Sequence, residues 1–364
     1  RAPAERNLKM SIDFKALEQR LAYPPAGKLR VVIDTDAYNE VDDQFAIAWA
    51  LRSPERMKVE AVYAAPFCSL AFANFFGIPA GAPSEDVKKL IHWADTPCDG
   101  MEQSYQEIKN LFALLGEDAA GRVYRGSPEY LKDKQTPVAS EAARDLAARA
   151  MASDEPLYVL AIGAITNVAS ALLLEPAIKD RIVVVWLGGQ PLHFPRTVEF
   201  NLIQDIKAAQ VVLDSGVPLV LIPCMTVASA LTVSAEELKG RLNGKSRIGT
   251  YLADTVINCF DDKTIPTATI MMKKSYLGGL DDVPDKVAAQ FPTVRTSWTR
   301  IIWDISTAAY LMNPNWCLTT EVPAPVLTDD GRWQAGEGRH PIRVCNYIFR
   351  DPIFGDLFAK LDKD

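Results

Sequence analysis

The residues with the clearest chemical potential are acidic and lie close together near the beginning of the chain. Five acidic side chains fall within ten positions: Asp34, Asp36, Glu40, Asp42 and Asp43. Carboxylates gathered at one place repel one another unless a cation or a polar substrate compensates their charge. Hard oxygen ligands of this kind suit Ca²⁺ or Mg²⁺ better than Zn²⁺. The segment therefore predicts a site for a divalent cation.

Two secondary-structure elements must position this acidic segment. Residues 31–33 form an apolar, β-branched run typical of a buried parallel strand, and an apolar helix is expected over residues 45–51. In an open α/β sheet, ligands bind at the carboxyl ends of the strands, which is where the acids fall. Asp42 and Asp43 could instead only cap the helix that follows them. This alternative leaves the two earlier aspartates unexplained.

Farther along the chain, strand-like and helix-like patterns alternate. Strands are predicted over residues 59–65, 157–162, 182–187 and 219–222, and helices over 70–93, 103–115, 140–151, 166–174 and 206–213. Such alternation is typical of an α/β fold with a mostly parallel central sheet and helices on both faces. The expected division is an N-terminal extension over residues 1–28 and a single domain over residues 29–364.

Composition limits the classes of function. The net charge is −7 and no long basic run occurs, so nucleic acid is not an expected partner. No apolar stretch reaches about 18 residues, the length that spans a bilayer, so no membrane association is expected. The six cysteines are widely spaced without a Cys-x-x-Cys motif, which argues against a zinc site. A cytoplasmic location is expected, and export stays open because the chain starts at Arg1.

Residues 34–46 resemble the opening motif of the nucleoside hydrolases, the calcium-dependent N-ribohydrolases, usually written Asp-Thr-Asp-Pro-Gly-x-Asp-Asp-Ala-x-Ala. Asp34-Thr35-Asp36 and Asp42-Asp43 match this motif. Residues 37–41 separate the two matches, where the family has only three residues, and the Pro-Gly turn is absent. The resemblance implies a nucleoside-hydrolase-like (Rossmann-like) fold and a bound Ca²⁺.

The turn over residues 163–169 resembles the family's Gly-x-Leu-Thr-Asn-Ile-Ala. The resemblance implies that the carbonyl oxygen of Ile162, at the end of the preceding strand, is a calcium ligand. A carbonyl is a reasonable ligand because Ca²⁺ takes six to eight oxygen atoms. The same residues also fit a simple helix start capped by Thr166 or Asn167.

Residues 301–309 resemble the family's His-Asp-x-x-Ala segment. The resemblance implies that Asp304 completes the calcium ligands with Asp36 and Asp43, although Asp304 could instead cap the following helix. The histidine that normally precedes this aspartate, and is thought to protonate the departing base, is Trp303 here. An indole cannot supply that proton but can stack on a base or a sugar face.

A third segment implies polar contacts to a sugar. Glu199-Phe200-Asn201 resembles the family's Glu-Phe-Asn, whose polar side chains hold the ribose 5′-hydroxyl. Six residues earlier, His193 stands where the family has a ribose-contacting asparagine, with a plain surface histidine as the alternative. Another family asparagine is replaced by Phe67, which would give the substrate an apolar surface. Asn39 and Glu40 are candidates for the missing polar contact.

Together these segments imply a calcium-dependent hydrolase that cleaves the N-glycosidic bond of a ribonucleoside or a related N-riboside. Asp42, next to a metal ligand but not itself a ligand, would take the proton of the attacking water as general base. Without the base-protonating histidine, a leaving group that departs easily, or protonation by water or Glu40, must fill the gap. The alternatives are a hydrolase of the same fold in carbohydrate metabolism and a non-catalytic sugar- or calcium-binding protein. A small-molecule partner is expected, and a homo-oligomer stays open.

Overall fold

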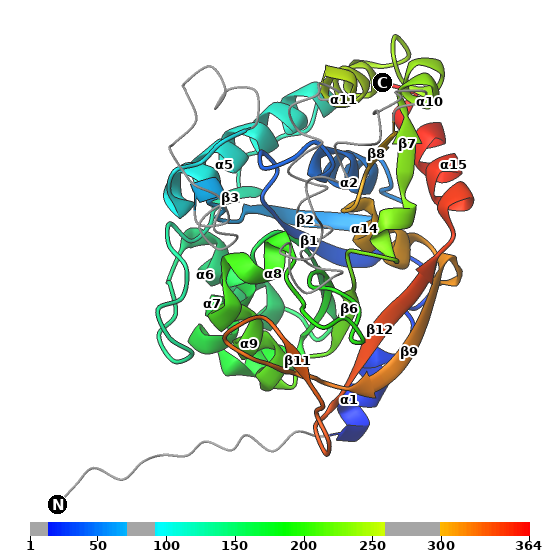
Figure 1. The fold of residues 1–364 in the computed structure, drawn as a ribbon. Coiled ribbons are helices and arrows are strands. Elements are labelled where there is room, and N and C mark those ends of the chain that lie inside the picture. The colour runs from blue at the N-terminus through cyan, green and yellow to red at the C-terminus, as the bar shows by residue number, and fades with distance from the viewer. Residues whose placement is uncertain (1–13, 71–91, 259–298) are drawn as a thin grey trace, which may run out of the picture.

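The structure is a computed structural model that describes residues 14–70, 92–258 and 299–364. The strands of its main sheet are β1 (Leu29–Thr35), β2 (Met57–Ala64), β3 (Val123–Arg125), β4 (Leu157–Ile162), β5 (Ile182–Leu187), β6 (Leu219–Ile222), β9 (Cys317–Pro323) and β12 (Pro341–Ile348). Their order across the sheet is β3-β2-β1-β4-β5-β6-β12-β9 (Figure 1). All neighbours are parallel except β9, which pairs with β12 in the antiparallel sense.

Helices and two small strand pairs surround this sheet. The strand pairs are β7 (Thr232–Ser234) with β8 (Thr299–Ile301), and β10 (Val326–Leu327) with β11 (Trp333–Gln334). The α-helices of the described residues are α1 (Phe14–Leu21), α2 (Asp43–Leu51), α5 (Pro97–Leu115), α6 (Glu141–Met151), α7 (Thr166–Leu174), α8 (Phe200–Gln204), α9 (Ile206–Ser215), α10 (Ala235–Arg241), α11 (Arg247–Asn258), α14 (Ile305–Met312) and α15 (Arg350–Leu361).

Buried apolar side chains form one layer on each face of the sheet. Val31 and Ile33 belong to the layer that packs against α2, α5, α11, α14 and α15, whereas Val32 belongs to the layer against α6, α7 and α9 (Figure 1). Successive side chains of a strand point to opposite faces, so an uninterrupted apolar run is buried on both. The predicted α/β fold with a mostly parallel sheet and helices on both faces is confirmed.

Helix beginnings follow from capping residues. Ser140 precedes α6 as predicted, and its hydroxyl accepts a hydrogen bond from the N–H of Ala143 at 3.1 Å. The helix α5 begins six residues before the predicted position 103, because Thr96 and Asp99 form a capping box at its start. The helical pattern over residues 70–93 lies almost entirely outside the described residues.

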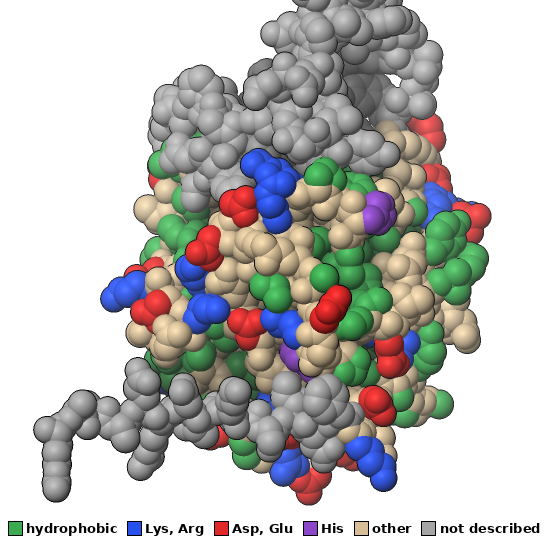
Figure 2. All heavy atoms as spheres, turned by 60° about the horizontal axis from the view of Figure 1, so that its bottom comes forward, with side chains coloured by type: hydrophobic (Ala, Val, Ile, Leu, Met, Phe, Trp, Pro, Cys, Tyr) green, Lys and Arg blue, Asp and Glu red, His purple; other side chains and the backbone are tan. Residues whose placement is uncertain are grey.

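The extension before β1 contributes to the core. Leu17 and Leu21 of α1 are buried, and the Arg343 Nε donates a hydrogen bond to the Leu21 carbonyl at 2.8 Å. The division into an extension and one domain stays a prediction. None of the described helices is long and apolar enough to cross a bilayer. On the face shown in Figure 2, acidic and basic side chains are interspersed among apolar and polar ones.

Candidate active site

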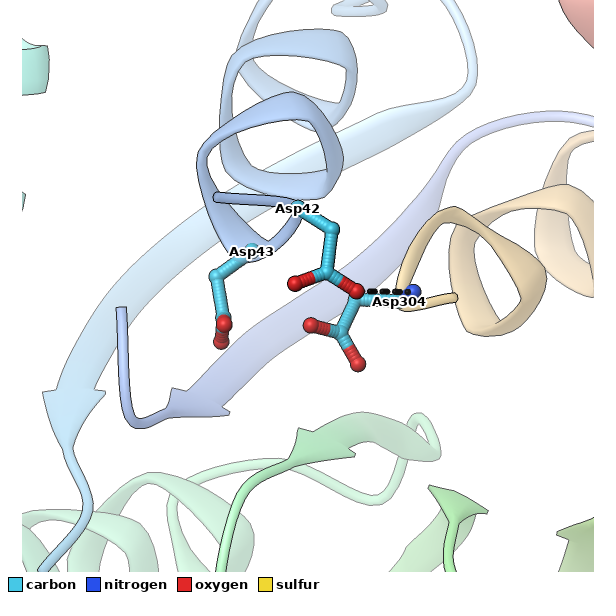
Figure 3. Close-up of side chains that lie close together, drawn as sticks. All are labelled: Asp42, Asp43 and Asp304. Atoms are coloured by element: carbon cyan, nitrogen blue, oxygen red, sulfur yellow. Dashed lines mark hydrogen bonds between the residues drawn. The ribbon is translucent and has the colours of Figure 1, made fainter. Parts of the chain in front are cut away.

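Three aspartates converge beyond the carboxyl end of β1 (Figure 3). Asp42 and Asp43 stand at the start of α2, and Asp304 stands at the start of α14. One carboxylate oxygen of each lies within 4.8 Å of the other two, and all three side chains are buried. The backbone N–H of Asp304 donates a hydrogen bond to Oδ2 of Asp42 at 3.3 Å. Two segments that are distant in the sequence thus share one acidic site.

These carboxylates do not cap their helices. Asp42 and Asp304 occupy the N-cap positions of α2 and α14, yet neither side chain accepts a hydrogen bond from the first turn. Asp43 accepts a hydrogen bond from the hydroxyl of Thr35, the last residue of β1. The capping alternative is therefore wrong for Asp42 and Asp304, and the side chains are available for chemistry.

Asp36 lies beside the end of β4. Its side chain is 1% exposed, and its Oδ2 has no hydrogen-bond partner among the described residues. A Cβ added to Gly163 would lie 3.2 Å from the Cγ of Asp36, so the carboxyl group packs over this glycine. Ile162 precedes Gly163 in the chain and pairs with Thr35 in the sheet. The predicted carbonyl ligand and Asp36 therefore meet at the ends of neighbouring strands.

Burial and mutual repulsion change the acidity of the group. Burial, together with repulsion from nearby carboxylates, raises the pKa of Asp36, Asp42 and Asp304 well above the ordinary value of an aspartate. Burial raises the pKa of Asp43 to about 7, against the opposing effect of hydrogen bonds from its neighbours. Acids packed in this way ionise together only when a cation lies among them.

The donor atoms fit a hard divalent cation. The compact group of Asp42, Asp43 and Asp304 contains neither histidine nor cysteine, and Asp36 adds a buried oxygen without a partner. All of these atoms are oxygens, as Ca²⁺ and Mg²⁺ require. The compact group differs from the predicted carboxylate ligands in one member, since it includes Asp42 and does not include Asp36. Which of these two is the ligand stays a prediction.

Comparison with known proteins gives the family. Residues 31–348 match the family described as inosine-uridine preferring nucleoside hydrolase. The chain belongs to this family. Its relatives include the putative pyrimidine-specific ribonucleoside hydrolase RihB of Shigella boydii (serotype 4, strain Sb227), 41% identical over 75 residues, which are 20% of this chain and 31% of the relative. The match thus spans less than a third of that relative's length.

Solved nucleoside hydrolases share the fold. A purine-preferring ribonucleoside hydrolase from Gardnerella vaginalis superimposes with a TM-score of 0.63 at 17% identity, over 92% of this chain and 98% of that one. A plant nucleoside hydrolase, the PpNRh1 enzyme, gives a TM-score of 0.61 at 17% identity, over 93% and 100%. The family resemblance found in the short motifs is confirmed, and the shared fold extends over nearly the whole chain.

In this member of the nucleoside hydrolase family, Asn167 joins the acidic segment to the segment after β3 through hydrogen bonds. Its Nδ2 donates to Oδ1 of Asp34 at 2.8 Å, and its Oδ1 accepts from the N–H of Ser127 at 2.8 Å and from the Ser127 hydroxyl at 3.0 Å. Burial raises the pKa of Asp34 to about 7, and the hydrogen bond from Asn167 opposes that shift. Position 126 has room only for glycine, because a Cβ there would lie 1.9 Å from the Ala64 carbonyl oxygen.

Neither residue that could have capped α7 does so. The N-cap is Ile165, without a side-chain hydrogen bond, and Thr166 donates its hydroxyl to Asp205 at 2.8 Å. The capping alternative is thus wrong for Thr166 and Asn167. Both side chains instead join α7 to neighbouring segments of the site.

Replacing Asn167 with alanine is expected to lower the free energy of unfolding by about 1–3 kcal/mol. The loss follows because Asp34 and Ser127 would be left buried without their partner. Urea unfolding at neutral pH measures it. The matched control is Asn110→Ala, since Asn110 is exposed and donates a hydrogen bond to Glu107 at 3.2 Å. Equal losses in the two variants would contradict the role given to Asn167.

Glu199 and Asn201 of the family's Glu-Phe-Asn motif are both buried and both bonded to the backbone. The Glu199 carboxylate accepts hydrogen bonds from the N–H groups of Gly189, Asn201 and Leu202 at 2.9, 2.9 and 3.0 Å. The Asn201 Nδ2 donates to the carbonyl of Leu187, the last residue of β5, at 3.0 Å. Burial raises the pKa of Glu199 to about 7. These bonds orient both residues at the carboxyl end of β5.

The remaining predicted sugar contacts occupy different environments. His193 is exposed, with its ring centroid 5.1 Å from that of Phe194. Trp303 is half-buried and packs against the core layer that contains α2 and α14. Asn39 is half-buried, and its backbone N–H donates to the Asp36 carbonyl at 2.7 Å. Substrate binding by these residues stays a prediction.

Phe67 lies close to the start of α5. Its side chain is fully buried, and a Cβ added to Gly100 of α5 would lie 2.7 Å from the Phe67 Cδ1. The ring therefore packs against α5, and the apolar substrate surface expected of Phe67 stays a prediction.

Two residues near the acids were not predicted. Burial and the nearby carboxylates of Glu199 and Asp42 raise the pKa of the Cys224 thiol. The Tyr130 hydroxyl is hydrogen-bonded to Oε1 of Gln204. No sequence motif marks either residue. Their places after β6 and β3, at the carboxyl ends of parallel strands, are the signal that could have found them.

Proposed function

We propose that this protein is a calcium-dependent hydrolase that cleaves the N-glycosidic bond of a ribonucleoside or a related N-riboside. The observation that carries the proposal is the buried group of Asp42, Asp43 and Asp304 in a chain of the nucleoside hydrolase family. The descriptions of the RihB relative and of the Gardnerella enzyme as ribonucleoside hydrolases support it.

The calcium would be held by Asp36, Asp43, Asp304 and the carbonyl oxygen of Ile162. Calcium is favoured over magnesium because it accepts more oxygens in less regular arrangements, and this set is drawn from separate segments. When bound, the cation supplies positive charge that orients sugar hydroxyls and makes a water molecule more acidic. It also compensates the repulsion among the buried acids.

Asp42 would act as the general base. Its carboxylate is buried, and the Asp304 N–H holds one of its oxygens in place. A raised pKa brings a carboxylate closer to the working pH, which makes it a better proton acceptor. As the oxygen of the water bonds to the anomeric carbon, one proton of the water passes to Asp42. The electrons of the broken C–N bond leave with the departing nucleobase. Carboxylates around the ring stabilise the positive charge that develops on the sugar.

The sugar would be held by Glu199 and Asn201 at its 5′-hydroxyl. The backbone N–H groups of Gly189, Asn201 and Leu202 hold the Glu199 carboxylate in a fixed orientation, so that a sugar hydroxyl would meet a positioned acceptor. Asn39, Glu40 and His193 are proposed as further polar contacts. These assignments can be separated from catalysis because their loss should raise KM more than it lowers kcat.

The second candidate is a hydrolase of the same fold that acts on another carbohydrate. It is favoured by Trp303, which occupies the position of the family's base-protonating histidine. An indole stacks on a sugar face but donates no proton to a departing base. Parallel assays on nucleosides and on xylosides and glucosides separate the two candidates.

Removing calcium with the chelator EGTA is expected to abolish hydrolysis, and adding calcium back is expected to restore it. The metal-free protein should also melt at a lower temperature, since a ligand at a hundredfold excess over its Kd stabilises the native state by about 2.7 kcal/mol. Thermal unfolding and a reducing-sugar assay measure the two effects. EGTA saturated with calcium is the control. Full activity in a protein that elemental analysis shows to be metal-free would contradict the proposal.

A further inference from the structure

An ion pair joins the two chain segments that carry the aspartates. Oε1 of Glu40, in the loop between β1 and α2, lies 2.8 Å from Nη2 of Arg300 in β8. The glutamate side chain is 35% exposed and the arginine side chain 19%, so both are mostly enclosed. Glu40 stands just before Asp42 in the chain, and Arg300 stands just before Asp304. The pair therefore sits at the junction where these two aspartates meet.

Further contacts hold the backbone of the loop that carries Glu40. Gln44 donates its Nε2 to the Ala37 carbonyl at 2.6 Å and to the Glu40 carbonyl at 3.3 Å. The Tyr38 ring stacks on His92, with 4.3 Å between the ring centroids. These contacts hold the backbone of the loop and leave the Glu40 side chain directed to Arg300. The extra residues of this loop thus form an ordered connection to β8.

Electrostatics makes such a connection useful. Asp42 and Asp304 repel one another, and they lie 262 positions apart in the sequence. The backbone between them therefore does not hold the two segments together. The Glu40 carboxylate adds to the repulsion on Asp42 and Asp43, so the ion pair helps by joining the two segments and by bringing the positive charge of Arg300 to the junction. Arg300 also interacts favourably with the Asp42 carboxylate. A guanidinium suits this task because it stays charged and pairs with a carboxylate in a fixed geometry.

We propose that Glu40 and Arg300 form a clamp that positions Asp42, Asp43 and Asp304 for one cation. The inference rests on the proposed function, because it assigns the clamp to the proposed calcium centre. Glu40 and Arg300 are positioning residues: they touch the ligand-bearing segments and not the cation. Oε2 of Glu40 has no hydrogen-bond partner among the described residues, so the clamp leaves that oxygen for a sugar hydroxyl.

The test is a calcium titration of the metal-free, full-length protein by calorimetry. Glu40→Gln and Arg300→Met should each weaken calcium binding about tenfold or more. Removing the groups that hold metal ligands in place typically lowers metal affinity by about this factor. The double variant should bind no worse than the weaker single variant, because both changes break the same interaction. The exchanged pair, Glu40→Arg with Arg300→Glu, should regain part of the affinity. Thermal unfolding of the same metal-free variants separates a loss of calcium affinity from a loss of general stability.

The chain offers a matched control. Glu117 pairs with Arg122 at 2.7 Å, its side chain is 37% exposed, and Arg122 also donates to the carbonyl of Val59 near the opposite end of the sheet. Glu117→Gln should leave the calcium Kd within twofold of wild type. Thermal unfolding of the metal-free proteins monitors folding, and if Arg300→Met does not fold, the nearly isosteric Glu40→Gln decides alone.

The outcomes separate the clamp from the proposed function. Single variants within twofold of wild type, or effects that simply add, would overturn the clamp even if the wild-type protein hydrolyses ribosides. A wild-type protein that binds calcium through this coupled pair but hydrolyses no riboside would leave the clamp standing and overturn the function. A wild-type protein that binds no calcium would overturn both.

Discussion

Asp42→Asn is expected to lower the hydrolysis of a good riboside substrate at least about a hundredfold while calcium binding stays within a few-fold of wild type. General base catalysis contributes typically about 10² to 10⁴ in rate, and an amide cannot take the proton. The substitution keeps the shape of the side chain, and the asparagine carbonyl can still accept the N–H of Asp304, which lies 3.3 Å from Oδ2 in the native protein.

The companion variant Asp36→Asn makes this result decisive. Asp36 is proposed as a ligand, so its replacement should lose both calcium and activity. Since Asp42 and not Asp36 lies in the compact group with Asp43 and Asp304, the opposite pattern is a defined outcome. If Asp42→Asn lost calcium while Asp36→Asn kept it without activity, the two roles would be exchanged. Asp118→Asn, at an exposed position, controls for the loss of a negative charge.

The second large effect concerns the leaving group. The protein is expected to hydrolyse p-nitrophenyl riboside with a kcat/KM at least about a hundredfold above that for inosine. Nitrophenolate departs without a proton, whereas a purine needs an acid, whose absence costs about 10² to 10⁴ in rate. Trp303 stands where the family's acid would be. Steady-state rates on both substrates, at saturating calcium, measure the ratio.

A single added histidine sharpens this prediction. Trp303→His should raise the rate on inosine more than the rate on p-nitrophenyl riboside, because only the purine benefits from a proton donor. Inosine hydrolysis by the unaltered protein with a kcat/KM of about 10⁴ M⁻¹s⁻¹ or more, the ordinary range for enzymes, would refute the prediction. Another side chain would then have to supply the proton.

How far the sequence predicts the fold depends on where each strand lies in the sheet. Residues 157–162 and 182–187 belong to central strands buried on both faces, so continuous apolar runs reveal them. The edge strand β9 has the residues Leu-Thr-Thr-Glu after its first cysteine, and Leu318 is 52% exposed. Its sequence is polar because one side faces solvent, so no run marks it.

The site shows the same division between local and distant information. Asp34, Asp36, Asp42 and Asp43 could be predicted because they lie within ten residues of a strand end. The ion pair of Glu40 with Arg300 could not, since its partners come together only in the folded chain. The packing of a side chain is equally hidden, as the closeness of Phe67 to Gly100 of α5 shows.

The hydrogen bond between Asp304 and Asp42 spans 262 residues, and that separation bears on how the protein folds. Closing so long a loop costs conformational entropy, so this contact belongs among the late events of folding. The Asp304 carboxylate meets the other aspartates only at that stage, so its share of the repulsion acts on the nearly finished molecule. A chain still growing on the ribosome has half of the acidic site in place after residue 43 and the other half only after residue 304. The acidic site is therefore completed only by a chain that has almost finished folding, and partly folded forms have no complete calcium centre to stabilise them.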